Sequence, residues 1–452
     1  MMTTHPRSAD TVATQPTPAT APPARAVRTP ARGWLIAAML CVLMTINFAD
    51  KSVLGLAAEP LMRDLGLTPS QFGLAGSIFF LLFGVTGVVV GFLGNRFTST
   101  RLLMVIALAW SVAMMPLLLF PSLAGLLVNR LLLGAAEGPT APLASHAVQK
   151  WFSDSRRAVP ASLVNLGAGL GIAIAAPVLT YLIITFGWQS AIWCMAVVSL
   201  VWAAGWKLVG REGPLDTYDS AADLPGDHTP AAEVRVPYRR LFAASSWWAP
   251  ILVLAPGYFS FAVFSVWGPS YFVTGLGYSP GTTGWLIAAY GLVMAFGHVF
   301  FAWLSGVLVR RGVGTRWARG VYMGAVVCLC GALLVAALAI GTGPWAAVLL
   351  LVSLGFAGTV HTIGFLLVAE SSPVGQRSAM LSSFNSVVTA FAVIAPFVAG
   401  VLVDTAATPT DGYRTAFLWC GILLIVGGLA GTVFIRPDRD TRRLGLRGND
   451  SD

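Results

Sequence analysis

The sequence has little charge and few residues of the types that build metal sites. Charged residues account for only 10% of its 452 residues, whereas a soluble domain carries about a quarter. The five cysteines all fall inside apolar runs, without the pairing of a metal site, and are expected to pack as small hydrophobic side chains. The shortage of charge excludes a soluble globular protein, because no soluble fold could bury so much apolar surface.

Signs of enzymatic chemistry are missing as well. No nucleophile–base pair, metal cluster or nucleotide-binding loop stands out. The run Gly167-Ala-Gly169-Leu-Gly171 lies in an apolar segment with no preceding strand, so it predicts close helix packing instead of a nucleotide site. We therefore predict no enzymatic activity, no metal and no cofactor.

Long apolar segments dominate the sequence, and 56% of its residues are hydrophobic. A helix needs roughly 20 mostly apolar residues to cross a bilayer. Twelve segments meet this requirement, near 34–56, 73–94, 101–120, 123–146, 159–183, 188–209, 247–270, 282–308, 318–340, 344–368, 379–402 and 413–435. The sequence predicts an all-α polytopic membrane protein with 12 transmembrane helices, in contact with lipid over most of its surface.

The spans form two sets of six. We predict an N-terminal six-helix half at 31–210, a polar cytoplasmic linker at 211–245 and a C-terminal six-helix half at 246–436. Residues 1–30 are rich in Pro, Ala and Thr and lack an apolar core, which predicts a disordered cytoplasmic tail. Residues 437–452 form a second cytoplasmic tail.

A short pattern repeats in the two halves. A glycine and two arginines follow the second span of each half at spacings of five and five, 215 residues apart (Gly91, Arg96, Arg101; Gly306, Arg311, Arg316). Two pseudo-symmetric halves of parallel topology, joined by a linker, are the layout of a secondary transporter that works by alternating access.

The basic residues indicate orientation. Of the 28 Lys and Arg residues, 24 lie in the two tails and the even-numbered loops. The positive-inside rule then places both termini in the cytoplasm, and the Pro/Ala/Arg-rich tails indicate the inner (plasma) membrane of a bacterium. Because the formal charge of +9 is explained by topology, we expect no nucleic-acid partner.

Four charged residues lie well inside the predicted spans, away from the span ends, and these are Asp50, Lys51, Arg130 and Glu137. Each costs about 2.5–3.5 kcal/mol to insert, so a function is expected of it. Arg130 and Glu137 are seven residues apart, which is two turns and nearly the same helix face. We expect the four to meet inside the N-terminal half.

Two interpretations of this cluster remain open. It could be a static set of ion bridges that holds two helices together, or its members could exchange partners during transport. A carboxyl group withdrawn from water can take up a proton and free its cationic partner to bind an anion. On the second interpretation Glu137 is the proton-coupling site with Asp50 as a second, and Lys51 and Arg130 bind the substrate.

Other polar residues in the spans are weaker candidates. Tyr258, Tyr290, Asn165, Ser383 and Asn385 could hydrogen-bond a substrate or a neighbouring helix. The roles of His298 and His361 stay open. Cytoplasmic gate contacts are expected from residues at the inner ends of the helices (Gly91, Arg96, Arg101, Arg311, Glu370, Arg377).

The loop after the second span carries a family resemblance. Gly91-Phe-Leu-Gly-Asn95-Arg96-Phe-Thr-Ser-Thr-Arg101 resembles the loop motif of the major facilitator superfamily, and the likeness extends from about 34 to 436. The motif has an acid where Asn95 stands. The resemblance implies the two-half fold named above, and carriers of this layout commonly work as monomers.

A narrower resemblance is to the anion:cation symporter family within that superfamily. Asn47-Phe48-Ala49-Asp50-Lys51 looks like the family's Asn-Tyr-x-Asp-Arg, and Arg130-Leu-Leu-Leu-Gly134-Ala-Ala-Glu137 looks like its Arg-x-x-x-Gly-x-x-Glu. The family carries sugar acids, phthalate-type and sialic-acid-type anions. Phe48 stands where the family has tyrosine, which favours an aromatic or less hydroxylated acid.

Taken with the intramembrane cations, the resemblance implies proton-coupled symport of a small organic anion such as a carboxylate. The alternative is a proton-coupled drug or metabolite efflux antiporter of the same superfamily. The sequence leaves open which anion is carried, whether protons or sodium ions drive it, and the oligomeric state.

Overall fold

The computed structural model describes residues 31–93, 97–152, 158–214, 236–314, 316–373, 376–435 and 439. Regular structure in these ranges is entirely helical, which confirms the all-α prediction. The first group of helices is α1 (Ala31–Leu56), α2 (Ala58–Leu65), α3 (Pro69–Leu93), α4 (Ser99–Ala113), α5 (Met115–Leu119), α6 (Leu123–Glu137), α7 (Thr140–Gln149), α8 (Ala158–Phe186) and α9 (Trp188–Val209).

The second group follows the linker. It consists of α10 (Tyr238–Phe242), α11 (Ser245–Ser270), a π-helical turn η2 (Tyr271–Gly275), α12 (Pro280–Arg310), a second π-helical turn η3 (Arg316–Val321), α13 (Tyr322–Ile340), α14 (Pro344–Ala357), α15 (His361–Glu370), α16 (Arg377–Thr405) and α17 (Pro409–Phe434). Most of the predicted linker, 215–235, lies outside the described residues.

Eleven stretches of helix in the described chain are long and apolar enough to cross a membrane, one fewer than the sequence predicts. The difference falls at the span expected near 123–146. That segment is helical, but it is divided into α6 and α7 at Gly138 and Pro139, and each piece is too short to count alone. Proline lacks the N–H that would continue the helix, and its ring clashes with the preceding turn.

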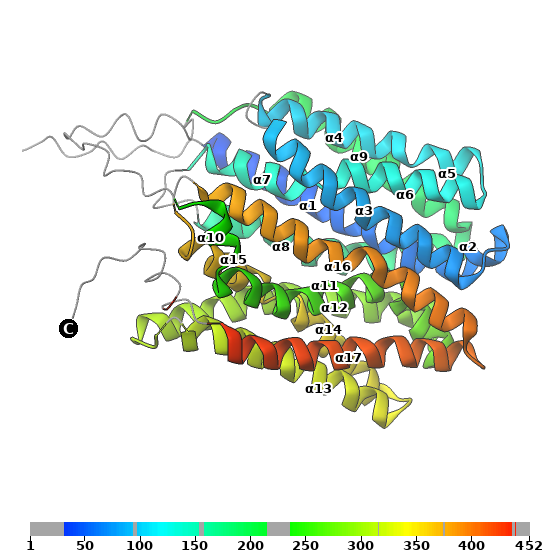
Figure 1. The fold of residues 1–452 in the computed structure, drawn as a ribbon. Coiled ribbons are helices and arrows are strands. Elements are labelled where there is room, and N and C mark those ends of the chain that lie inside the picture. Colours follow the sequence, from blue (N-terminus) through cyan, green and yellow to red (C-terminus); the bar gives the residue numbers. More distant parts are fainter. Residues whose placement is uncertain are drawn as a thin grey trace, which may run out of the picture.

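The long helices lie side by side in one bundle (Figure 1). Within the first group, α1 packs on α8, α3 on α6 and α4 on α9. Within the second group, α13 packs on α14 and α17, and α11 on α16 and α17. The two groups meet where α3 packs on α16, α8 on α12 and α1 on α11. Residues from distant parts of the sequence therefore share the middle of the bundle.

Glycines in α8 allow these close contacts. A Cβ atom added at Gly167 or Gly171 would collide with the backbone of α1, and one at Gly169 would collide with Gly291 and Ala295 of α12. Small residues let helix backbones approach closely in lipid. The prediction that this glycine run serves helix packing is thus confirmed, and α8 joins the two groups.

Hydrogen bonds connect the two groups at the end of the bundle that carries α2 and η2. The hydroxyl of Thr274 donates to the carboxylate of Glu59 at 2.8 Å, and Ser70 donates to Asp404. At the same end, Pro69 and Gly73 of α3 pack against Gly400 and Pro396 of α16. The two groups are therefore held together at this end.

At the opposite end of the bundle, one carboxylate of the first group accepts several hydrogen bonds. Glu212 accepts hydrogen bonds from Lys150 at 2.6 Å, from the Thr100 hydroxyl at 2.9 Å and from the backbone N–H groups of Ser99 and Thr100. The Glu212 carboxylate thus lies at the N-terminus of α4, where the free N–H groups of the first turn favour an anion. Burial raises the pKa of Glu212, but the hydrogen bonds from Lys150 and Thr100 outweigh burial and hold it below its usual value.

We expect Glu212→Gln to reduce the pH dependence of stability. Because the folded state lowers the pKa of Glu212, this carboxylate stabilises the fold above its unfolded pKa, about 4.3, and the contribution disappears as pH falls through the folded pKa. The thermal unfolding midpoint of wild type, measured in detergent from pH 7 downwards, should fall more than that of the variant. Identical pH profiles for the two proteins would contradict this role.

The predicted gate residues lie in several different settings. Arg101 and Arg311 are exposed at helix ends, and Glu370 forms an ion pair with Arg319 inside the second group. Gly91 lies near the end of α3, Arg377 begins α16, and Arg96 falls outside the described residues. Their gating role stays a prediction.

Candidate substrate and proton site

Helices α1 and α6 bring four charged side chains together in the first group. Asp50 and Lys51 lie in the second half of α1, and Arg130 and Glu137 lie on α6. Asp50, Arg130 and Glu137 are between 1% and 3% exposed, and the Lys51 side chain is 8% exposed. The four residues expected from the sequence to meet are therefore shielded almost completely from solvent.

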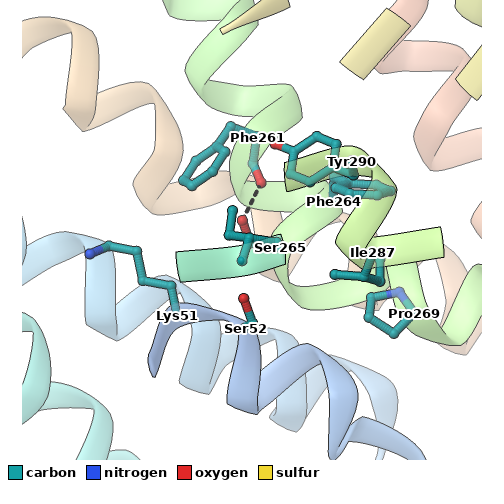
Figure 2. A pocket seen from close by; sticks show the side chains of 9 residues that line it. Lys51, Ser52, Phe261, Phe264, Ser265, Pro269, Ile287 and Tyr290 are labelled. Atoms are coloured by element: carbon teal, nitrogen blue, oxygen red, sulfur yellow. Dashed lines mark hydrogen bonds between the residues drawn. The ribbon is translucent and has the colours of Figure 1, made fainter. Parts of the chain in front are cut away.

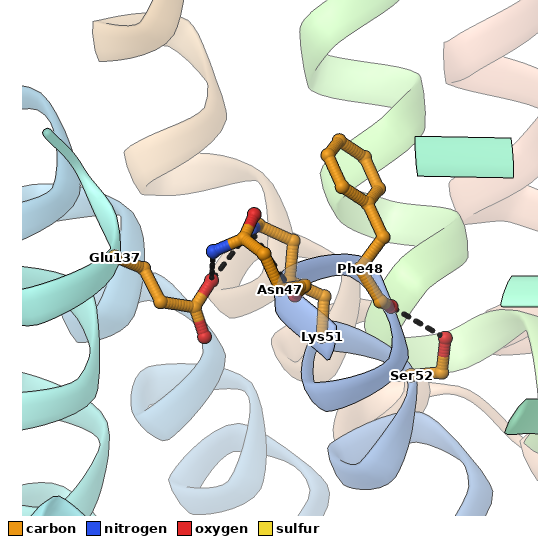
Figure 3. A network of polar contacts seen from close by, with 5 residues as sticks. All are labelled: Asn47, Phe48, Lys51, Ser52 and Glu137. Carbon is orange, nitrogen blue, oxygen red and sulfur yellow. Dashed lines mark hydrogen bonds and ion pairs between the residues drawn. The ribbon is translucent and has the colours of Figure 1, made fainter. Parts of the chain in front are cut away.

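An ion pair joins the two helices (Figure 3). Lys51 Nζ lies 2.5 Å from Glu137 Oε2. Asn47 bridges the pair, since its Nδ2 donates to Glu137 Oε2 at 2.9 Å and its Oδ1 accepts from Lys51 at 2.5 Å. Asn47 was not among the predicted site residues, although it stands in the motif that carries the family resemblance.

Aromatic rings surround the Lys51 ammonium group. Its Nζ lies 4.7 Å from the ring centre of Phe48, 5.2 Å from that of Phe83 and 5.8 Å from that of Phe79. Aromatic faces attract a cation within about 6 Å. These rings stabilise the charge of Lys51 where water is excluded.

The other carboxyl group of the cluster, that of Asp50, has no hydrogen-bond donor among the described residues. Neither oxygen of Asp50 makes a hydrogen bond within the described part of the chain, and the same holds for Glu137 Oε1 and Arg130 Nε. The Asp50 carboxyl faces that of Glu137, within reach of the charges of Arg130 and Lys51. A buried polar atom without a partner is costly. A proton on Asp50 would supply the missing donor, because its O–H could then bond to Glu137.

Gly134 sets the distance between α6 and α3. A Cβ atom at this position would overlap the backbone carbonyl of Phe79 on α3. The absence of a side chain at Gly134 therefore lets α3 approach α6 closely. Phe79 also faces Lys51, so this contact positions part of the site.

We therefore expect Gly134→Ala to destabilise the protein by about 1–3 kcal/mol, the usual cost of overpacking a filled interior. The thermal unfolding midpoint in detergent should fall. Gly281→Ala is a matched control, because a Cβ atom at Gly281 on α12 meets nothing within 4 Å. Equal thermal unfolding midpoints for the two variants would show that α3 and α6 can move apart at position 134 without loss of stability.

A cavity lies between the charge cluster and the second group of helices (Figure 2). Its empty space, including the part open to solvent, is about 330 Å³, and it is lined by Lys51, Ser52, Ile172, Phe261, Phe264, Ser265, Pro269, Ile287 and Tyr290. A second cavity has about 280 Å³ of empty space, again including the part open to solvent, and is lined by Lys51, Leu54, Gly76, Phe79, Phe80, Arg130, Ser265 and Val266. Lys51 and Ser265 border both, so the two cations of the cluster face space between the two groups of helices.

Of the polar residues predicted to bind substrate, Tyr290 lines the larger cavity. Tyr258 instead contacts His361, with 2.8 Å between its hydroxyl and the ring Nε2. Ser383 and Asn385 are half-buried on α16, and Asn165 is exposed on α8. These four lie outside the residues that line the two cavities, and their role stays a prediction.

The sequence did not single out Ser52, Ser265, Phe261 or Phe264 as site residues. Serine and phenylalanine are common in membrane helices and cost little to insert there. Unlike buried charges, they carry no signal that separates a cavity wall from an ordinary helix contact. Ser52 could have been found from its place beside Lys51.

Comparison with known proteins gives the family. A model described as the Major Facilitator Superfamily matches residues 40–360. A probable sulfoacetate transporter of Cupriavidus necator is 28% identical over 414 residues, which cover 89% of this chain and 94% of that protein. A hexuronate transporter of Bacillus subtilis is 26% identical over 408 residues, which cover 87% of this chain and 92% of that protein.

A solved structure shares the fold. A bacterial homolog of the human lysosomal transporter Spinster, in an inward-facing and unoccupied conformation, has a TM-score of 0.76 and 16% identity, covering 93% of this chain and 100% of that one. The curated relatives are transporters of acids, in agreement with the resemblance to the anion:cation symporter family. With a family model that spans well over half of its length, this polytopic membrane protein is a secondary transporter, and not an enzyme, and belongs to the Major Facilitator Superfamily.

Proposed function

We propose that this transporter takes up a small organic anion together with protons by alternating access. One observation carries the proposal. Two buried cations and two buried carboxyl groups meet beside a cavity, and several carboxyl oxygens among them have no donor in the described part of the chain. A static pair of ion bridges would leave no such orphaned oxygens. The arrangement favours a cluster that gains a proton at one stage of its cycle.

The charges of the cluster link the proton to the anion. Lys51 and Arg130 contribute two positive charges, and Asp50 and Glu137 contribute two negative charges when both are ionised. One proton shared by the two carboxyl groups changes the cluster from neutral to a net positive charge. In a medium of low dielectric constant such a charge strongly attracts an anion. Proton and anion are thus favoured together.

The geometry suggests how the carboxyl groups divide this work. Glu137 already accepts from Lys51 and Asn47 through Oε2, whereas Asp50 has no donor among the residues described. We infer that the proton resides on Asp50 and bonds to Glu137, which loosens the hold of Glu137 on Lys51. The two relatives are named as a probable sulfoacetate transporter and a hexuronate transporter, which supports an organic acid as the anion.

The packing of the two groups of helices supports a proposal for the rest of the transport cycle. We propose two six-helix halves, 31–210 and 246–436, that rock about the cavity. In this proposal α6 and α7 together form the fourth span, which brings the total to twelve. The protein lies in the inner membrane with both termini on the cytoplasmic side, and one copy of the chain is sufficient for transport. The end held by Thr274 with Glu59 and Ser70 with Asp404 is then the outer end. These bonds must break for substrate to enter from outside.

Proteoliposomes provide the test. A panel of labelled carboxylates, with sulfoacetate included, is offered to vesicles with an inward proton gradient, with and without a protonophore. Accumulation of an acid that collapses with the protonophore supports proton-coupled uptake. Accumulation that follows a sodium gradient instead contradicts proton coupling. If an inward proton gradient instead drives substrate out of preloaded vesicles, the result favours the efflux antiporter.

A further inference from the structure

The larger cavity is mostly apolar away from Lys51. Its far wall is formed by Phe261 and Phe264 of α11 and by Tyr290 of α12 (Figure 2). The ring centres of Phe264 and Tyr290 are 4.5 Å apart. The wall therefore suits a small, flat, apolar body.

The serine hydroxyls in the wall are already engaged as donors. Ser265 Oγ donates to the Phe261 carbonyl at 2.7 Å, and Ser52 Oγ donates to the Phe48 carbonyl at 3.1 Å. The Tyr290 hydroxyl makes no hydrogen bond with any described residue. Apart from Lys51, it is the one uncommitted donor that the described lining offers.

A sugar acid does not match this lining. Its several hydroxyls would lose their water on entry, and most would find no donor. Each unmatched buried hydroxyl lowers affinity about tenfold or more. An aromatic ring avoids that loss, since it can pack edge-to-face or offset against Phe261, Phe264 and Tyr290. The lining thus separates two kinds of acid that the charge cluster alone would treat alike.

We propose that the transported anion is a small aromatic carboxylate with few or no hydroxyl groups. Its carboxylate lies at Lys51 and Arg130, and its ring lies between Phe261, Phe264 and Tyr290. The proposal rests on the proposed function, because it takes the same cavity as the substrate site. It differs from the sugar acid that the name of the Bacillus relative prints.

Direct binding tests the proposal with three acids matched in ring size. Benzoate, cyclohexanecarboxylate and glucuronate each carry one carboxylate on a six-membered ring, and they differ in flatness and hydroxylation. Binding to the purified protein is measured by calorimetry, because uncharged benzoic acid crosses lipid unaided and would obscure a flux assay. Benzoate is expected to bind at least about tenfold more tightly than glucuronate, with cyclohexanecarboxylate between them.

Two variants locate the binding site. Phe261→Ala, or Phe261→Leu if the first does not fold, is expected to weaken benzoate binding about tenfold, since a ring contact is lost. Phe296→Ala is the control, because Phe296 lies on α12 and is 59% exposed on the outside of the bundle. Thermal unfolding of each variant shows that it is folded.

The outcomes separate this proposal from the one on which it rests. Glucuronate binding as tightly as benzoate, absence of benzoate binding, or benzoate binding unaffected in both Phe261 variants would overturn the aromatic substrate. Tight benzoate binding that Phe261→Ala weakens would support it. A protonophore-insensitive uptake of an aromatic acid that binds in this way would leave the substrate class standing and refute proton coupling.

Discussion

Asp50→Asn is expected to abolish proton-driven accumulation of the anion while leaving exchange of anion across the membrane intact. The asparagine amide is neutral and can donate a hydrogen bond to Glu137, as the protonated carboxyl of Asp50 would. The variant is thus fixed in the form that binds anion, and it cannot release a proton. A gradient of one pH unit supplies about 1.4 kcal/mol, enough for about tenfold accumulation by wild type. The variant should reach a ratio near one.

Two assays on the same proteoliposomes check this expectation. Accumulation is measured under an imposed pH gradient, and exchange is measured with saturating unlabelled anion on one side. Asp64→Asn serves as the control, because Asp64 lies on α2, outside the helices that carry the cluster, and its side chain is 46% exposed. Tenfold accumulation by Asp50→Asn would show that another group carries the proton. Loss of exchange as well would assign Asp50 to binding instead of coupling.

The long helices and the charge cluster could be predicted because both follow from the cost of placing groups in lipid. Runs of about 20 apolar residues can only be stable in a bilayer or a core, and a charge such as Arg130 is tolerated there only with a partner. The meeting of Asp50, Lys51, Arg130 and Glu137 followed from depth and helix face alone. The structure bears out that meeting.

The partners within the cluster could not be predicted in the same way. Arg130 and Glu137 share one face of α6, yet Glu137 pairs with Lys51 on α1. The choice depends on how far α1 and α6 approach each other, which is set by glycine contacts with neighbouring helices. A one-dimensional pattern does not encode that distance. The bridging position of Asn47 follows from it and was missed for the same reason.

The break at Gly138 and Pro139 shows a second limit. The apolar run near 123–146 is long enough to span, and proline is tolerated within membrane helices such as α8, which continues through Pro177. Hydrophobicity alone does not distinguish a proline that interrupts a helix from one that is accommodated. Here the break comes directly after Glu137, at the charge cluster.

The second large effect is expected for Lys51→Gln. Removing the ammonium group leaves Glu137 buried with Asn47 as its remaining donor in the described structure. Breaking one partner of a buried ion pair typically costs about 3–5 kcal/mol, because the other charge is left uncompensated. The variant should therefore unfold at a markedly lower temperature in detergent. It should also bind the anion more weakly, since a charged hydrogen bond is worth about 1.5–3 kcal/mol.

A double variant separates these two effects. Lys51→Gln combined with Glu137→Gln removes both charges, and the two amides can hydrogen-bond to each other and to Asn47. Most of the lost thermal stability should return, because no unpaired charge remains from the pair. Anion binding should not return, because Lys51 itself is missing. Lys51→Arg, which keeps the positive charge, is the matched control and should retain measurable binding. If instead the folded double variant bound the anion as wild type does, Lys51 would be a structural partner of Glu137 alone, and Arg130 would be left as the cation that binds the substrate.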